Sequence, residues 1–183
     1  LIQKHFMTLT YSMNEKIRQL NEKAKGLTAD AIIKLASDEF GAKITFASSL
    51  GEEDQVITDM IAKVAPAVQI FTLDTGRLFQ ESYDLLAKTQ KRYGQVKFRI
   101  MYPDTKAVEE MVQNKGINLF YESVENRKLC CGIRKVEPLR RALANMDAWM
   151  TGLRKSQSVT RTDLDVFQWD ADNNKVKVNP LAD

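Results

Sequence analysis

Histidine and cysteine are scarce in this chain, and their scarcity removes several kinds of chemistry. The 183 residues include one His, at position 5, and two Cys. A single histidine leaves no material for a Ser-His-Asp triad or a histidine-rich metal site. Two cysteines cannot build the disulfide framework of a small secreted protein. Any chemistry must therefore use the cysteines, basic side chains, carboxylates or the backbone.

Long apolar runs and a strong charge of one sign are missing as well. No stretch approaches the roughly 20 apolar residues of a membrane-spanning helix, and the first residues do not resemble a signal peptide. The net charge of +3 is too small to indicate a nucleic-acid binder. Eight Gly and four Pro are too few for a collagen-like or disordered chain. We therefore expect a cytoplasmic globular protein with reduced thiols, no membrane association and no nucleic-acid partner.

The hydrophobic pattern predicts helices that alternate with short buried strands. A capping box formed by Ser12 and Glu15 predicts a first helix that starts at Ser12 and ends near Gly26. Further helices are predicted over 29–40, 52–64, 77–93, 105–114 and 127–145, and strands over 43–47, 68–73, 96–101 and 148–151. The segments 164–169 and 175–178 flank an Asp/Asn-rich turn and predict a hairpin.

This order of elements predicts an α/β fold, with a mostly parallel sheet, helices on both faces and a C-terminal hairpin. Three polar turns follow predicted strands: SSLG (48–51), LDTG (73–76) and TGLRK (151–155). The carboxyl ends of parallel strands meet at one edge of a sheet, where open α/β sheets bind their ligands. We therefore expect the three turns to converge on one site.

The first turn continues as SSLGEED (48–54) into a predicted helix. Two hydroxyls, a glycine that permits close backbone approach and a helix N-terminus form a cradle for phosphate or sulfate. The acidic residues fit the preference of carboxylates for helix N-termini, and they would also repel an additional phosphate. Ser/Gly-rich turns are common between strands and helices. This motif alone is therefore equally consistent with an ordinary turn that binds no ligand.

The second turn continues as LDTGR (73–77). Asp74 and Thr75 fit a turn that caps the following helix. Arg77 would lie at the positive end of that helix, where a purely structural role explains a cation less well. A binding segment and a simple turn both remain open.

The two cysteines are adjacent, in CCGIRK (130–135). In a purely structural interpretation, one thiol is buried and the other has no function. In a redox protein the two could form a vicinal disulfide, but such a bond would be strained and is disfavoured in a reducing compartment. The functional interpretation is half of an iron–sulfur site, since such clusters need about four thiolates. On a regular helix Cys130 and Arg134, and likewise Cys131 and Lys135, are i,i+4 neighbours, which would place a cation beside each sulfur.

The fourth segment is TGLRKSQS (151–158), followed by Arg161. Basic side chains and hydroxyls in a loop after a strand suit an anionic substrate. A solvated basic loop is the common alternative. A basic stripe for nucleic acid is another, although it lacks interleaved aromatic residues.

Taken together, these four segments resemble the assimilatory sulfonucleotide reductases, the family of adenylyl-sulfate and phosphoadenylyl-sulfate reductases. The resemblance includes Glu81 after LDTGR, VEPLRRAL after CCGIRK, and the terminal KVNPLAD, and it covers about residues 44–183. It implies an adenine nucleotide α-hydrolase-like fold, in which 1–40 form N-terminal helices and 41–183 a sulfonucleotide-binding α/β domain.

The resemblance also implies roles for individual residues. Ser48, Ser49 and Gly51 match the loop on the phosphosulfate side, and Asp54 its polar end. Leu73, Thr75 and Gly76 match the segment near adenine and ribose, beside which Arg77 is a further candidate. Gly152, Arg154 and Arg161 match the substrate-binding loop. Cys130 and Cys131 match the tandem-cysteine half of a 4Fe–4S site, and Lys135 matches the supporting lysine between cluster and substrate.

The family implies a reaction and partners. A cysteine near the C-terminus attacks the sulfur of the sulfonucleotide, releases AMP or its 3′-phosphate analogue, and leaves an S-sulfocysteine from which thioredoxin or glutaredoxin releases sulfite. The branch with tandem cysteines and a cluster uses adenylyl sulfate, for sulfate assimilation and cysteine biosynthesis; phosphoadenylyl sulfate is the alternative substrate. The family forms dimers or tetramers, which implies a homo-oligomer.

Two family segments are not found between residues 1 and 183: a second cysteine pair spaced CxxC, and a Glu-Cys-Gly-(Leu or Ile)-His segment that carries the nucleophile. VKVNPL (176–181) resembles the start of a new element, so we expect a C-terminal continuation. Residues 1–183 alone are expected to show no reductase turnover. The alternatives are a degenerate nucleotide-binding homologue and a related ATP pyrophosphatase or sulfate adenylyltransferase subunit, whose SGGKDS-like loop contains a Lys that SSLGEED lacks.

Overall fold

The computed structural model describes residues 2–154 and 164–182. Its helices are α1 (Ile2–Ala24), α2 (Ala29–Phe40), α3 (Glu52–Val64), α4 (Gln80–Arg92), α5 (Thr105–Lys115), α6 (Val124–Cys131) and α7 (Glu137–Leu143). Short turns of other helix types are η1 (Gly41–Lys43), η2 (Leu119–Tyr121) and η3 (Gly132–Val136). The strands are β1 (Ile44–Ala47), β2 (Gln69–Leu73), β3 (Phe98–Met101), β4 (Ala148–Met150), β5 (Phe167–Asp170) and β6 (Lys175–Val178).

These strands form one six-stranded sheet in the order β3-β2-β1-β4-β6-β5. All neighbouring strands are parallel except β5 and β6, which form an antiparallel hairpin at one edge. The α/β fold class, the mostly parallel sheet and the C-terminal hairpin expected from the sequence are therefore confirmed.

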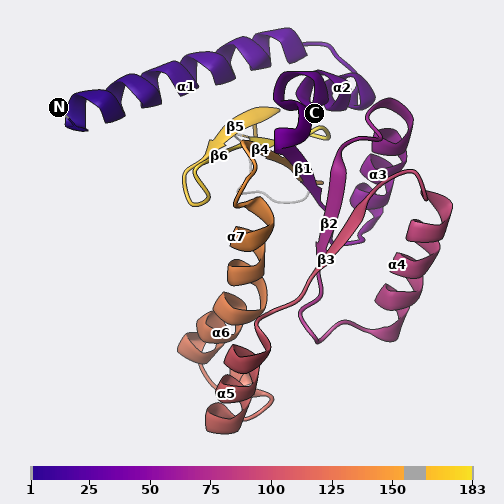
Figure 1. The fold of residues 1–183 in the computed structure, drawn as a ribbon, viewed down its shortest axis with the longest axis vertical. Helices are drawn as coiled ribbons and strands as arrows, with labels where there is room; N and C mark the ends of the chain where they lie inside the picture. The colour runs from indigo at the N-terminus through magenta and orange to yellow at the C-terminus, as the bar shows by residue number, and fades with distance from the viewer. Residues whose placement is uncertain (1, 155–163, 183) are drawn as a thin grey trace.

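Helices cover both faces of the sheet (Figure 1). On one face, α1, α2 and α3 pack on the strands around a core that includes Ile33, Phe46, Ile57 and Val178. On the other face, α7 packs Leu143 and Ala142 against side chains from β2 and β3. The two cores arise because successive side chains along a strand point to opposite faces.

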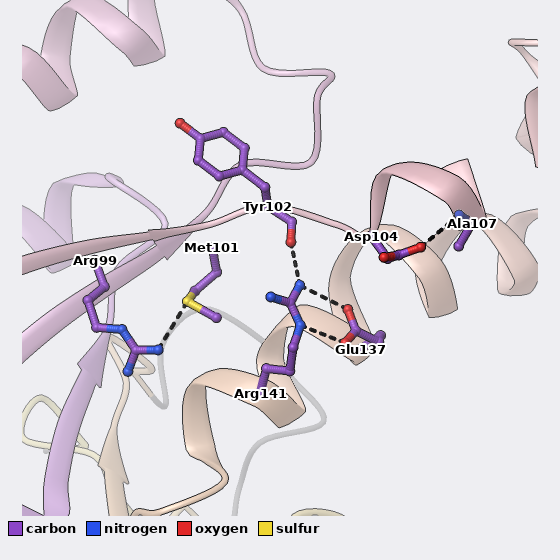
Figure 2. Close-up of polar contacts among 7 residues, drawn as sticks. All are labelled: Arg99, Met101, Tyr102, Asp104, Ala107, Glu137 and Arg141. Carbon is purple, nitrogen blue, oxygen red and sulfur yellow. Dashed lines mark hydrogen bonds and ion pairs between the residues drawn. The ribbon is translucent and has the colours of Figure 1, made fainter. Parts of the chain in front are cut away.

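α5 and α6 lie at the end of the molecule opposite α1 and α2, and α7 leads back from them to the sheet (Figure 1). Figure 2 shows how this junction is held: Arg141 of α7 bonds both carboxylate oxygens of Glu137 and the backbone carbonyl of Tyr102, just after β3. Asp104 then caps α5 by accepting a hydrogen bond from Ala107 N at 2.9 Å. The end of β3 thus joins α7 and α5.

The order of strands creates a crevice at the carboxyl edge of the sheet. β2 and β3 lie on one side of β1, whereas the chain returns to the other side of β1 as β4. The boundary between β1 and β4 is therefore a topological switch point, and open α/β sheets bind ligands at such points.

Three local expectations about helices were wrong. The helix predicted over 77–93 starts only at Gln80. The first helix starts at Ile2 and continues through Ser12, so the Ser12–Glu15 pattern is not a helix start. The predicted helix 127–145 starts earlier, at Val124, and contains the π-helical turn Gly132–Val136 between α6 and α7. A π-turn bonds residue i to i+5, so the regular i,i+4 geometry expected for the cysteines and the cations after them does not apply there.

Hydrogen bonds connect the N-terminal helix α1 to strand β5 of the sheet. The side-chain amide of Asn21 donates to the carbonyl of Phe167 at 2.8 Å and accepts from the amide of Phe167 at the same distance. This pair of bonds satisfies the outward-facing backbone groups of Phe167 on the edge strand β5. Within the described ranges, no helix is both long enough and apolar enough to cross a bilayer.

Candidate functional site

The turn after β1 is organised by one buried carboxylate. Asp54, in the first turn of α3, accepts hydrogen bonds from the backbone N and the Oγ of Ser49, both at 2.6 Å. The hydroxyl of Ser48 accepts from Leu50 N at 3.1 Å, and Leu50 has a positive φ of 66°. Gly51 is the N-terminal flanking residue of α3. Asp54 therefore fixes the turn that presents the two serines.

The same carboxylate meets the loop after β4. A Cβ added at Gly152 would lie 2.1 Å from Asp54 Oδ1, so only glycine fits at this position without displacing the carboxylate. Two residues on, Arg154 pairs with Glu53 of α3. Arg161 and residues 155–160 lie outside the described residues. The loops after β1 and β4 converge as the sequence predicted.

The turn after β2 is held by a second buried carboxylate. Asp74 Oδ1 accepts from Gly76 N at 2.8 Å and from the hydroxyl of Tyr83 at 3.1 Å. The hydrogen bond to Asp74, and then burial, raise the pKa of Tyr83. Asp74 thus ties the turn to α4, whose first residue is Gln80 rather than residue 77 as expected.

A buried arginine joins this turn to the segment after the cysteines. Arg134 Nη1 donates to the carbonyl of Thr75 at 2.7 Å, and its Nε has no hydrogen-bond partner among the described residues. Gly76 has a φ of +70°, and an added Cβ would lie 3.2 Å from Arg134 Nη1. Glycine is needed there both for the backbone conformation and for the close approach. Arg134 therefore bonds to the β2 turn, although the sequence paired it with Cys130.

The turns after β1 and β2, together with residues of α4, η3, α7 and β4, enclose a cleft of about 340 Å³ at the carboxyl edge of the sheet. Its polar lining comes from the predicted Ser48, Ser49, Thr75 and Lys135, together with Thr72 and Ser82. Its apolar lining comes from Ala47, Leu50, Phe71, Leu73, Leu78, Leu139 and Trp149. Among the described residues that line the cleft, Lys135 is the only cation, so it is the group best placed to bind an anion there.

Other predicted residues lie beside the cleft rather than in its lining. Arg77 donates to the carbonyl of Ile117 at 3.2 Å and to Asn118 Oδ1 at 3.1 Å, and its guanidinium lies 4.7 Å from the ring centre of Phe120. It connects the β2 turn with the segment between α5 and η2. The described neighbours of Arg77 thus give it a structural role, and a role in binding stays a prediction.

The tandem cysteines lie at the end of α6 as free thiols. Cys130 is buried with Met111 and Leu119, whereas Cys131 is only partly buried. Within residues 2–154 and 164–182, no group of three His, Cys, Asp or Glu side chains is placed to hold a metal ion. The described residues supply two thiolates, which is half of the usual ligand set of a 4Fe–4S cluster and does not complete one.

Sequence reasoning missed three residues of this site. Asp74 was interpreted as a helix cap but instead holds Gly76 and Tyr83. Trp149 was placed in a buried strand, yet its ring lines the cleft, and a large aromatic residue two positions before a Thr-Gly turn was the available signal. Arg134 had no signal of its own, because its contact with Thr75 joins positions 59 residues apart.

The fold and the cleft define an α/β protein with a ligand crevice at the switch point of a parallel sheet. Residues 43–183 match the family described as the phosphoadenosine phosphosulfate reductase domain. This match covers most of the chain, and the chain belongs to that family. The resemblance inferred from the four motifs is therefore confirmed.

Relatives and a solved structure agree with this assignment. The chain is 47% identical over 140 residues to the adenosine 5'-phosphosulfate reductase of Allochromatium vinosum, covering 76% of this chain and 54% of that protein. It is 38% identical over 174 residues to the enzyme of the same name from Sinorhizobium fredii, covering 95% and 68%. The crystal structure of the phosphoadenylyl-sulfate reductase of Candida auris, a phosphate complex, superposes with a TM-score of 0.77 at 30% identity, covering 91% of this chain and 78% of that one. This chain spans about half the length of the first of these relatives.

Proposed function

We propose that this chain forms the sulfonucleotide-binding part of an assimilatory reductase that converts adenylyl sulfate to sulfite and AMP. The observation that carries the proposal is the cleft itself, in which Ser48, Ser49 and Thr75 lie together with Lys135. Hydroxyls and one cation suit a phosphosulfate group, and the apolar wall suits a nucleobase. The family match supports the same substrate class.

Adenylyl sulfate is preferred over its 3′-phosphorylated form for two reasons. The relatives at 38% and 47% identity carry the name adenosine 5'-phosphosulfate reductase. The turn after β1 also leads into three consecutive acidic residues, Glu52, Glu53 and Asp54, which disfavour an additional phosphate. Phosphoadenylyl sulfate remains the alternative substrate, which the binding experiment below compares directly.

The chemistry proposed for the complete enzyme follows the family. A cysteine thiolate attacks the sulfur of adenylyl sulfate, the bond from sulfur to the phosphate oxygen breaks, and AMP leaves with the electron pair. Thioredoxin or glutaredoxin then supplies two thiols, becomes oxidised to a disulfide and releases sulfite from the S-sulfocysteine. In this chain, Ser48, Ser49 and Lys135 would bind and orient the phosphosulfate, and Gly152, Arg154 and Arg161 would contribute the loop after β4.

Cys130 and Cys131 are proposed as two ligands of a 4Fe–4S cluster, with the other two ligands from outside the described residues. A cluster held by four thiolates would supply a redox-active centre close in sequence to Lys135. We also propose a cytoplasmic location, assembly into a homo-oligomer, and division into N-terminal helices (1–40) and a nucleotide-binding domain (41–183).

Binding of adenylyl sulfate to residues 1–183 tests this proposal. Equilibrium dialysis is expected to give saturable binding that is tighter than binding of phosphoadenylyl sulfate or ATP. Lys135→Ala should weaken it about tenfold or more, because a charge-assisted bond contributes about 1.5–3 kcal/mol. Lys128→Ala is the matched control, since Lys128 is exposed on α6 and does not line the cleft. Tighter binding of ATP, or equal effects of the two substitutions, would contradict the proposal.

A further inference from the structure

Two aromatic residues of the sheet line the cleft; Phe71 of β2 is almost fully buried, whereas Trp149 of β4 is partly exposed. We propose that its indole forms the wall on which the nucleobase of the ligand stacks, and that Asp170, from the β5–β6 hairpin, orients that ring as a positioning residue. This inference rests on the proposed function, because it identifies which part of a sulfonucleotide meets which wall.

The strand register fixes the side of the sheet on which Trp149 lies. It is paired with Thr45 of β1 and with Lys177 of β6, and it packs against the core that α7 covers. Its ring also lines the cleft, next to Leu139 of α7. The indole is therefore half-buried, with part of its surface supported by the core and part turned to the cleft.

Two contacts hold the ring in one orientation. The indole Nε1 donates to Asp170 Oδ2 at 3.0 Å, at the point where β5 ends. The ammonium of Lys177 lies 5.3 Å from the centre of the ring. Asp170 is itself held by Asn173, whose side-chain amide donates to Oδ2 at 2.7 Å. An edge hairpin far from the loops thus sets the angle of a ring inside the cleft.

The distribution of polar groups indicates which part of the ligand meets this wall. Ser48 and Ser49 come from the loop after β1 and Lys135 from η3, whereas Trp149 belongs to β4 itself. A sulfonucleotide has one flat, uncharged part, its base, and a charged end that needs Lys135 and the serines. Stacking of a base on an aromatic side chain is worth about 1–3 kcal/mol by alanine substitution. The base therefore gains the most binding free energy by stacking on the indole of Trp149.

The chain's two tryptophans make the test selective. Trp169 is the natural control: its register partner is Val176, in the core on the opposite face, and it lines a different cavity with Lys16 and Glu39. In Trp169→Phe, where Trp149 is the only tryptophan, AMP is expected to quench the indole emission. In Trp149→Phe, AMP should bind with little loss but leave the emission of Trp169 unchanged. AMP binding is measured independently in each variant by equilibrium dialysis.

Affinity and rescue test the two residues separately. Trp149→Leu keeps an apolar side chain but removes the ring, so AMP should bind about tenfold more weakly. Asp170→Ala should weaken binding about fivefold and reduce the quenching, because the indole loses its acceptor. Asp170→Asn retains an acceptor oxygen and should restore both.

The outcomes separate this inference from the proposed function. If AMP binds to Trp169→Phe without changing its emission, or binds to Trp149→Leu as tightly as to the unmodified chain, the stacking wall is wrong while nucleotide binding stands. If Asp170→Asn fails to rescue a loss seen with Asp170→Ala, the positioning role is wrong. If no form of the chain binds AMP or adenylyl sulfate, the proposed function fails, and the stacking wall fails with it.

Discussion

At the scale of single residues, the candidate site depends on carboxylates that bind protein rather than ligand. Asp54 holds Ser49 through its backbone N and hydroxyl, and it packs against Gly152. Asp74 likewise holds Gly76 and Tyr83. Bonds to a charged acceptor contribute about 1.5–3 kcal/mol each. Both carboxylates therefore pre-organise loops whose own side chains line the cleft.

Gly152→Ala tests the contact between Asp54 and the loop after β4. The added methyl group would displace the Asp54 carboxylate and break its bonds to Ser49, so we expect a loss of stability of about 1–3 kcal/mol and about tenfold weaker binding of adenylyl sulfate. Denaturant unfolding and equilibrium dialysis measure the two effects.

Gly94→Ala provides the matched control for this substitution. A Cβ at Gly94 meets no atom within 4 Å, and the glycine has no positive φ. Both measurements should therefore stay close to those of the unmodified chain. If Gly152→Ala is as stable as Gly94→Ala and binds adenylyl sulfate as tightly, the Asp54 carboxylate can move without loss of stability or affinity, and the prediction is wrong.

At the scale of elements, packing of α3 against α4 includes polar contacts that local patterns do not indicate. The hydroxyl of Tyr93, directly after α4, donates to Asp59 Oδ1 of α3 at 3.0 Å. Thr89 of α4 donates to Gln55 of α3 at 3.2 Å. Burial, followed by the bond to Asp59, raises the pKa of Tyr93. Two helices that flank the β1 and β2 turns are thereby joined on the side away from the cleft.

The raised pKa of Tyr93 gives a pH dependence with a definite sign. Above pH 10, the ordinary pKa of a tyrosine, the unfolded chain loses this proton first. The stabilisation is therefore complete below that pH and is lost as the pH rises through the higher pKa of the folded state. Tyr93→Phe should make the alkaline loss of stability less steep, as measured by urea unfolding at a series of pH values.

Tyr121→Phe, at an exposed tyrosine of η2, is the control and should leave the pH profile of stability unchanged. Equal profiles for Tyr93→Phe and the unmodified chain would refute the prediction.

At the scale of the whole molecule, the strand order decides where the cleft forms. The chain places β4 on the far side of β1 from β2. This brings Arg154, after β4, to Glu53 of α3, 101 residues away in the sequence, and it adds Trp149 of β4 to the cleft lining. Because the cleft is assembled from separate parts of the folded chain, a ligand that fills it must stabilise the whole fold.

AMP should therefore raise the melting temperature of residues 1–183. At a concentration of about 100 times its Kd, a ligand that binds only the folded state adds about 2.7 kcal/mol. For a chain of this size, that corresponds to an upward shift of roughly 5–10 °C. Sodium chloride at the same ionic strength controls for general screening and should shift the melting temperature far less. An equal shift with the salt would contradict specific binding to the cleft.

The sequence by itself determined the alternation of elements and the turns that carry polar residues. The bounds of α2 and α3 were predicted to the residue, because each is an apolar-periodic segment with a clear start and end. The helix start at Ser12 was wrong, since a capping pattern also occurs inside a helix that extends further. The single helix expected over 127–145 missed a π-turn, which no local pattern marks.

Only the tertiary structure decided which of the candidate residues share a site. The motifs marked Ser49, Thr75 and Lys135, and the fold brings these three into one cleft. The same motifs marked Arg77, whose described contacts lie instead with the segment between α5 and η2 and with Phe120 of η2. Contacts such as Trp149 with Asp170 depend on how distant strands pair. A sequence records periodicity and local turn chemistry, but the partners of a side chain follow from strand order and register, which form only when the whole chain has folded.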